Sequence, residues 1–210
     1  MLSYIAGLLL FFSGAVNPTN TFEGTIELIY ISQYDTTFFT YHVKKDFIRV
    51  DKLDTHHALT QATLINLTSE EIFVLSPARK MYTQIDKKIR DNNSNKNFEI
   101  IKTENSRTIN HSVCYQWRVK NIERNTEISY WVKNTDFYSF DKFVHLINNV
   151  ENFYEFYEKI PDSQGFFPVL VEERTLLRAE KSKLSVEKMT PKSLNDNIFK
   201  IPDNYEKVNL

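Results

Sequence analysis

Residues 22–30 read Phe22-Glu23-Gly24-Thr25-Ile26-Glu27-Leu28-Ile29-Tyr30, with apolar residues or glycine at the even positions and mostly polar residues at the odd ones. This period of two is typical of a half-buried β-strand. Similar short segments follow at residues 37–44, 47–52, 60–67, 71–76 and 80–86, with turn-compatible residues between them. Because a parallel crossover needs about a dozen residues or more, strands joined this closely must be antiparallel. The first half of the chain is therefore predicted to form a meander.

The second half combines further strands with a helical pattern. Strands are expected at residues 98–103, 112–120 and 127–133, after a polar loop at 90–97, and again near 169–175 and 183–188. Between these groups, large apolar residues recur three or four positions apart, at Phe140, Phe143, Val144, Ile147, Val150, Tyr154 and Tyr157. This spacing places them on one face of a helix, which Ser139 would cap and Pro161 would end. At about 1.5 Å per residue, such a helix would run roughly 30 Å and cross a whole sheet.

The fold class predicted from these patterns is mainly β (α+β). One amphipathic helix cannot cover both faces of a sheet with about ten or eleven strands. We therefore expect a strongly curved antiparallel sheet, or open half-barrel, with one long helix on its concave face. Any space that the helix does not fill would become a cavity.

Composition limits the class of protein and the compartment. A length of 210 residues indicates one domain, which we place at residues 16–210. The formal net charge of −1 argues against nucleic acid as a partner. Residues 1–16 are an uncharged and mostly apolar run that contains the small residues Ser13-Gly14-Ala15. This pattern predicts a signal peptide at 1–15 and export to the periplasm or the medium. Because no Lys or Arg precedes the apolar run, an apolar N-terminal strand or helix is the alternative. The mature chain has no other segment long and apolar enough to span a bilayer.

Three groups of short motifs carry a family resemblance. Phe22-Glu23-Gly24-Thr25-Ile26 leads to Leu75-Ser76-Pro77-Ala78-Arg79-Lys80-Met81-Tyr82. Residues 109–117 around Cys114 precede Glu127-Ile128-Ser129-Tyr130-Trp131-Val132. Gly165-Phe166-Phe167-Pro168 precedes Phe199-Lys200-Ile201-Pro202-Asp203-Asn204-Tyr205.

In their order and spacing these motifs resemble the bacterial exported family DUF4412, a domain of unknown function, and more distantly the LolA/LolB-like lipoprotein-carrier fold. The resemblance covers nearly all of the mature chain. It implies an open antiparallel barrel or half-barrel with a helical lid, but it does not imply lipoprotein transport, since one fold serves many functions. One position departs from the family pattern, because His111 stands where the family tends to have glycine.

No group of residues predicts an enzyme. Asp51, Asp54, His56 and His57 supply metal-ligand types, but they fall in an expected surface loop and lack a recognised ligand spacing. Cys114 is the only cysteine, and on a strand its side chain would point away from that of His111, so core packing is the expected role. Hydrolase, phosphate-loop and dinucleotide motifs are absent from the sequence. We therefore predict no catalytic residue, no metal and no cofactor.

The leading hypothesis is a non-enzymatic cell-envelope protein that binds a lipid, an acyl chain or another hydrophobic ligand between sheet and helix. The predicted cavity walls are Phe140, Phe143, Val144, Ile147, Tyr154 and Tyr157 from the helix, and Ile26, Leu28, Tyr30, Ile48 and Val50 from the strands. Ordinary core packing of these residues is the alternative. A second hypothesis is a periplasmic scaffold or stress-type protein that binds an envelope protein partner. It would use a sheet edge or the aromatic residues Phe153 and Phe156, which lie off the main helical face.

Overall fold

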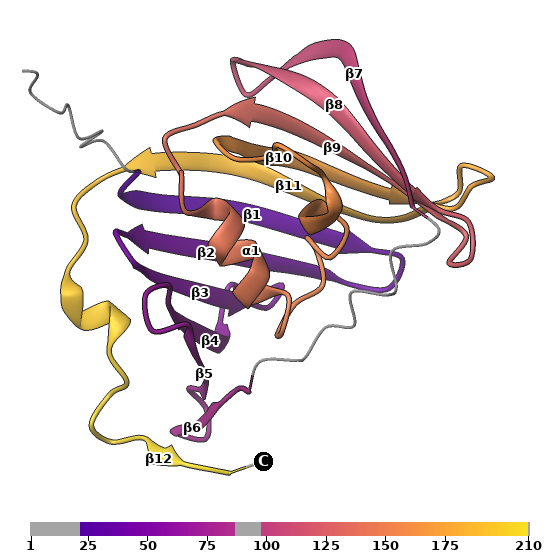
Figure 1. Cartoon of the computed structure of the whole chain (residues 1–210). Coiled ribbons are helices and arrows are strands. Elements are labelled where there is room, and N and C mark those ends of the chain that lie inside the picture. Colours follow the sequence, from indigo (N-terminus) through magenta and orange to yellow (C-terminus); the bar gives the residue numbers. More distant parts are fainter. Residues whose placement is uncertain (1–21, 87–97, 210) are drawn as a thin grey trace, which may run out of the picture.

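A computed structural model describes residues 22–86 and 98–209. The predicted signal peptide and the predicted loop at 90–97 lie outside the described residues. Those residues form one twelve-stranded sheet in the order β12-β6-β5-β4-β3-β2-β1-β11-β10-β9-β8-β7 (Figure 1). Every neighbouring pair is antiparallel except β12 and β6, which are parallel.

The six strands of the first half follow each other in space as they do in sequence, so the predicted meander is confirmed. They are β1 (Gly24–Ser32), β2 (Thr36–Lys44), β3 (Phe47–Leu53), β4 (Leu59–Asn66), β5 (Glu71–Ser76) and β6 (Met81–Gln84). The second half contains β7 (Phe98–Ile109), β8 (Ser112–Asn121), β9 (Thr126–Asn134), β10 (Phe166–Arg174) and β11 (Glu180–Pro191). A short strand near the C-terminus, β12 (Glu206–Lys207), was not expected from the sequence.

The two halves join where β1 pairs with β11. This pairing runs from Gly24 opposite Pro191 to Ser32 opposite Ser182. At its first end the two backbones lie very close, since a Cβ atom on Gly24 would stand 2.2 Å from the carbonyl oxygen of Thr190. Glycine is therefore required there by the neighbouring strand.

The helix is much shorter than predicted. α1 spans Phe140–Ile147, and turns lead through residues 148–156 to a 3₁₀ turn, η2, at Tyr157–Lys159. The Asn149 side chain donates to the carbonyl oxygens of His145 and Leu146, at 3.1 and 2.9 Å. An asparagine that bonds back to the last turn competes with continued helix. The prediction of one long helix was therefore wrong. The apolar spacing that suggested it continues to Tyr157, but the helical backbone ends at Ile147.

The predicted curvature was also wrong. The sheet is twisted but it is neither closed nor strongly curled (Figure 1). A half-barrel needs a helix long enough to fill it, whereas eight residues of helix extend only about 12 Å. α1 lies against the middle strands of one face, as Figure 1 shows. We call this the inner face and the opposite one the outer face.

Each face carries its own apolar cluster. The main core lies between the inner face, α1 and the turns that follow it, and includes Phe143, whose ring meets Tyr41 of β2 edge-on at 5.3 Å. A smaller cluster on the outer face packs Leu64 and Leu75 against Ile201 and Tyr205. It is covered by the C-terminal segment, which includes a 3₁₀ turn, η3 (Asp196–Phe199). Within the described residues, no helix has the length and apolar character that crossing a membrane would require.

Candidate functional site

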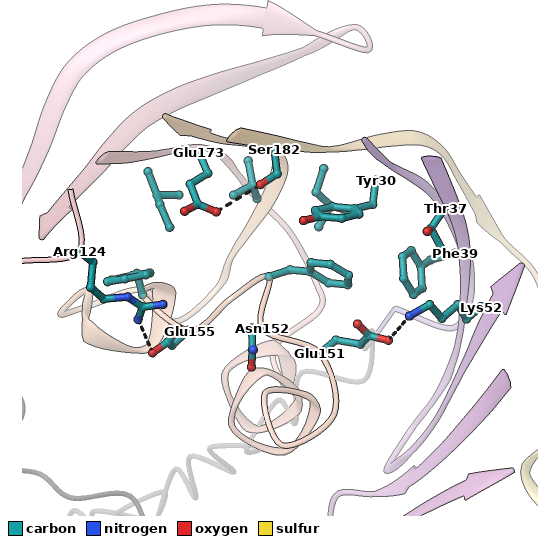
Figure 2. Close-up of a pocket in the computed structure, with 15 residues that line it drawn as sticks. Tyr30, Thr37, Phe39, Lys52, Arg124, Glu151, Asn152, Glu155, Glu173 and Ser182 are labelled. Carbon is teal, nitrogen blue, oxygen red and sulfur yellow. Dashed lines mark hydrogen bonds and ion pairs between the residues drawn. The ribbon is translucent and has the colours of Figure 1, made fainter. Parts of the chain in front are cut away.

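A cavity of about 300 Å³ lies between the inner face and the turns that follow α1 (Figure 2). Its walls come from the ends of β1, β2, β3, β9, β10 and β11, from the β8–β9 turn and from residues 151–156. The lining residues are Tyr30, Thr37, Phe39, Lys52, Arg124, Ile128, Glu151, Asn152, Phe153, Glu155, Phe156, Val171, Glu173, Ser182 and Leu184.

Aromatic and aliphatic side chains from the sheet and from Phe153 form one part of the cavity wall. The ring of Phe153 lies 4.7 Å from that of Tyr30 and meets Phe39 edge-on at 5.1 Å. Val171 and Leu184, on neighbouring strands, are 6 % and 3 % exposed. Because successive residues of a strand alternate between faces, these side chains all point to the inner side of the sheet. They give the cavity an apolar surface that can bind hydrocarbon.

Two ion pairs hold the turn segment over this surface. Lys52 Nζ of β3 lies 3.0 Å from Glu151 Oε1, and Arg124 Nη1 of the β8–β9 turn lies 2.8 Å from Glu155 Oε1. Figure 2 shows the two pairs on opposite sides of the cavity. Both pairs reach solvent, so each contributes about 0–1 kcal/mol to stability. The segment is therefore held by its buried aromatic rings, and the two ion pairs add weak contacts at the solvent side.

A third carboxylate, Glu173, lies on the sheet side of the cavity. Its Oε2 accepts from Ser182 Oγ at 3.3 Å, and its Oε1 lies 3.3 Å from Lys181 Nζ. Thr126 Oγ1 also donates to Glu173, at 3.4 Å, and accepts from Lys181. Each charged group in this part of the cavity thus has a partner of opposite charge or a hydrogen bond.

Three tyrosine hydroxyls lie in the adjoining core. Tyr41, Tyr130 and Tyr154 are each 0 % exposed, and their hydroxyls make no hydrogen bond of regular geometry among the described residues. Burial raises the pKa of all three phenols, and the neighbouring Tyr154 adds to the increase for Tyr41. They are therefore neutral at physiological pH, and the Tyr41 and Tyr154 hydroxyls interact with each other. Buried polar groups of this kind are normally satisfied by water or by a ligand.

The structure distributes the eleven predicted ligand-binding residues over several places. Tyr30 lines the cavity. The other ten are buried in the main core: Phe140, Phe143, Val144, Ile147, Tyr154, Tyr157, Ile26, Leu28, Ile48 and Val50. Ligand binding by these residues stays a prediction.

The off-face aromatics Phe153 and Phe156 line the cavity and do not form a surface cluster. Phe156 is only 4 % exposed. Lys52, Arg124 and Glu173 also line the cavity, and no local sequence pattern predicts that they do. For the aromatics, an available signal was the asparagines Asn148, Asn149 and Asn152, which disfavour continued helix and leave the following aromatics free to face the sheet.

The residues considered for metal binding have separate structural roles. Asp51 Oδ2 lies 3.1 Å from His42 Nε2. Asp54 Oδ1 accepts from the backbone N–H groups of His56 and Ala58 at 2.8 and 2.9 Å, and these bonds lower the pKa of the Asp54 carboxyl. The His57 ring packs on a phenylalanine at 4.3 Å. Among residues 22–86 and 98–209, no group of three or more His, Cys, Asp or Glu side chains could hold a metal ion.

Cys114 has the packing position that the sequence predicts. It is 0 % exposed within the main core, and burial raises the pKa of its thiol. His111 lies in the turn between β7 and β8 with φ +61°, and Asn110 beside it has φ +48°. A left-handed backbone is the conformation that favours glycine. The departure from the family pattern therefore leaves the turn intact but places a strained residue in it.

Comparisons with known proteins complete the description. A family model described as "Domain of unknown function (DUF4412)" matches residues 22–205. No curated protein sequence matches the chain. An uncharacterised conserved protein from Thermus thermophilus superposes with a TM-score of 0.55 at 8 % identity, over 90 % of this chain and 91 % of that one. At this identity the likeness is one of fold alone.

Two further solved structures overlap less well. The MucB chain of the Pseudomonas aeruginosa MucA/MucB complex gives a TM-score of 0.49 at 8 % identity, over 89 % of this chain and 57 % of that chain. A Vibrio parahaemolyticus domain described as an outer membrane lipoprotein-sorting protein gives 0.34 at 10 % identity, over 84 % and 87 %.

Proposed function

The chain belongs to the DUF4412 family, and we propose that it is an exported, non-enzymatic protein that binds one small amphipathic molecule in the cavity beneath residues 151–156. The observation that carries this proposal is the composition of the cavity. Aromatic and aliphatic side chains line it from the sheet, together with Glu173 and Ser182, and the Lys52–Glu151 and Arg124–Glu155 pairs lie around the opening. A molecule with a hydrocarbon part and a polar end matches both regions.

The volume limits the size of the ligand. About 300 Å³ is at the lower end of the range of roughly 300–1,000 Å³ that small-molecule sites occupy. This favours a single acyl chain or a compound of similar size over a lipid with several chains. Burial of its hydrocarbon would contribute about 25 cal/mol for each Å² removed from water.

The polar end has several possible hydrogen-bonding partners. Lys52 and Arg124 at the mouth each bind a glutamate of the turn segment, and an anionic head group would compete for these cations. In the adjoining core, the Tyr41 and Tyr154 hydroxyls make no hydrogen bond of regular geometry among the described residues. A fatty-acid carboxylate bound to Lys52 would thus take the place of the Glu151 carboxylate, and the hydrocarbon chain of the fatty acid would lie against Phe39.

A binding role, as opposed to catalysis, is supported by how the charged groups are used. General acid–base chemistry needs a group that reaches the substrate and can exchange its proton. Glu151 and Glu155 hold the turn segment by ion pairs, and Glu173 is bound by Ser182 and Lys181. The proposed export rests on the apolar run at 1–16, which lies outside the described residues.

The proposal can be tested by filling the cavity. Ser182 points into it from β11, whereas Ser185, three residues further along the strand, points to the outer face. We expect Ser182→Trp to weaken binding of a fluorescent fatty acid at least about tenfold, by occupying the space that its chain needs. Ser185→Trp should bind like the unchanged protein.

Native mass spectrometry of protein purified from a periplasm without detergent gives an independent readout. Adducts of fatty-acid mass in the Ser185→Trp variant that are lost in Ser182→Trp support the proposal. Equal fatty-acid affinity in the two variants, with matching unfolding midpoints, would contradict the assignment of the cavity.

A second candidate function is the binding of an extended protein segment at the sheet edge. β7 is an edge strand of twelve residues, and residues 104–108 along it are all exposed. An edge of this length offers backbone groups with which another strand can pair. Hydrogen exchange would test it, because a bound segment should slow exchange of the β7 amides when the partner is added. Unchanged β7 exchange in the presence of an envelope fraction would count against it.

A further inference from the structure

Three exposed apolar side chains lie on separate turns at the same end of the sheet. Tyr34 in the β1–β2 turn is 94 % exposed, Ile122 in the β8–β9 turn 72 %, and Leu177 in the β10–β11 turn 90 %. In Figure 1 the ends of these three hairpins lie at the right-hand side of the sheet. We call the three turns, residues 33–35, 122–125 and 175–179, the hairpin end.

The three turns are tied to one another. The backbone N–H of Leu176 donates to Asn125 Oδ1 at 3.1 Å, which joins the β10–β11 turn to the β8–β9 turn. Gln33 Nε2 donates to the carbonyl oxygen of Glu180 at 3.0 Å, which joins the β1–β2 hairpin to β11. The apolar tips therefore project from one supported surface, so little additional ordering is needed when they bind.

The hairpin end adjoins the mouth of the cavity. Arg124, which belongs to the same turn as Ile122, lines the cavity and holds Glu155. Thr37, near the start of β2, and Ser182, near the start of β11, line it just inside the adjoining turns (Figure 2). A ligand that enters or leaves by this mouth would pass close to the three tips.

We propose that the hairpin end docks on the surface of a lipid bilayer, with Tyr34, Ile122 and Leu177 inserted among the lipid head groups. The inference rests on the proposed function, since docking would place the cavity mouth against the source of its ligand. Apolar side chains at a membrane surface bind in proportion to the area they bury, and tyrosine is enriched at that level of the bilayer.

The arrangement favours a bilayer over a protein partner. A stable protein interface needs about 1,000 Å² or more of well-packed surface, whereas these tips are single side chains on three separate turns. Their surroundings carry both signs of charge, such as Arg178 and Glu180, and the tips do not sit in a basic patch that would select anionic lipid. Binding should therefore depend on apolar insertion and change little with salt.

Vesicle flotation tests the proposal with the full-length protein purified from a periplasm. The vesicles contain zwitterionic phosphatidylcholine and phosphatidylethanolamine. The triple variant Tyr34→Ser, Ile122→Ser, Leu177→Ser should lose at least about a hundredfold in partitioning, because three apolar side chains no longer insert. A matched control, Val113→Ser with Tyr115→Ser, removes apolar side chains that are 58 % and 41 % exposed on β8, away from the hairpin end. The control should float like the unchanged protein.

The fatty-acid probe separates this inference from the proposed function. In solution without vesicles, the triple variant should bind the probe with unchanged affinity, because the cavity is intact. If the wild-type protein floats with the vesicles but does not bind the fatty-acid probe, docking is supported and the proposed ligand is contradicted. Failure of the wild-type protein to float, equal flotation of the triple variant, or self-association through the hairpin end in gel filtration would each overturn the docking proposal.

Discussion

Replacement of Phe140 tests whether the aromatic residues between α1 and the sheet form a packed core. The Phe140 side chain is 1 % exposed. Its ring lies 4.8 Å from Phe167 of β10, 5.3 Å from Tyr154 and 5.5 Å from Tyr157, centroid to centroid, and all three contacts are edge-on. The first residue of α1 is thus held by rings from the sheet and from the segment after the helix.

The expected loss is large compared with the stability of a domain. Phe→Ala in a core costs about 3–5 kcal/mol through lost burial and the cavity left behind. Lost edge-on ring pairs, each worth about 0.5–1.5 kcal/mol, place Phe140→Ala in the upper part of that range, about 4–5 kcal/mol. A typical domain is stable by only about 5–15 kcal/mol. Phe140→Leu keeps most of the volume and should cost about 1–2 kcal/mol.

Urea unfolding followed by tryptophan fluorescence measures these losses as shifts of the midpoint. Phe47→Ala is the control, since Phe47 is 45 % exposed and its removal should cost less than about 1 kcal/mol. A loss of under about 1 kcal/mol for Phe140→Ala, together with weakened binding of the fatty-acid probe, would refute the reasoning. It would show that Phe140 borders a ligand, as the helical spacing first predicted.

Three further changes test single positions. Gly24→Ala should cost about 1–3 kcal/mol in urea unfolding, since its Cβ would meet the backbone oxygen of Thr190 at 2.2 Å; an unchanged midpoint would contradict that contact. His111→Gly should stabilise the protein by about 0.5–1 kcal/mol and raise Tm, because φ +61° disfavours histidine; the neighbouring Ser112→Gly should not. Asp54 has a pKa below its ordinary value of 3.8, through hydrogen bonds from two backbone N–H groups, so its stabilising contribution is present above that value. The gap in midpoint between Asp54→Ala and the unchanged protein should therefore be constant above about pH 5 and close as pH falls below about 4; a gap that widens on acidification would contradict the assignment.

The strands could be predicted because their signal is local. Ile26 and Leu28 are 0 % and 2 % exposed while Glu27 between them is exposed, as the period of two requires. All eleven predicted strands are present, and in the first half of the chain the short connections dictated antiparallel pairing. The predicted helix was too long because apolar spacing indicates which side chains are buried but does not define the backbone conformation between them. Tyr154 and Tyr157 are fully buried, but from turns and not from a helix.

The positions of the strands, the abundance of apolar and aromatic residues and the family resemblance could all be recognised in the sequence. Each of these follows from neighbouring residues or from short motifs. The pairing of β1 with β11, the ion pairs from Lys52 and Arg124 to residues 151–156 over a cavity, and the placing of three hairpin turns at one end of the sheet are evident only in the folded protein. These contacts join residues far apart in the chain, and their geometry depends on the register and twist of the whole sheet, which no local pattern encodes.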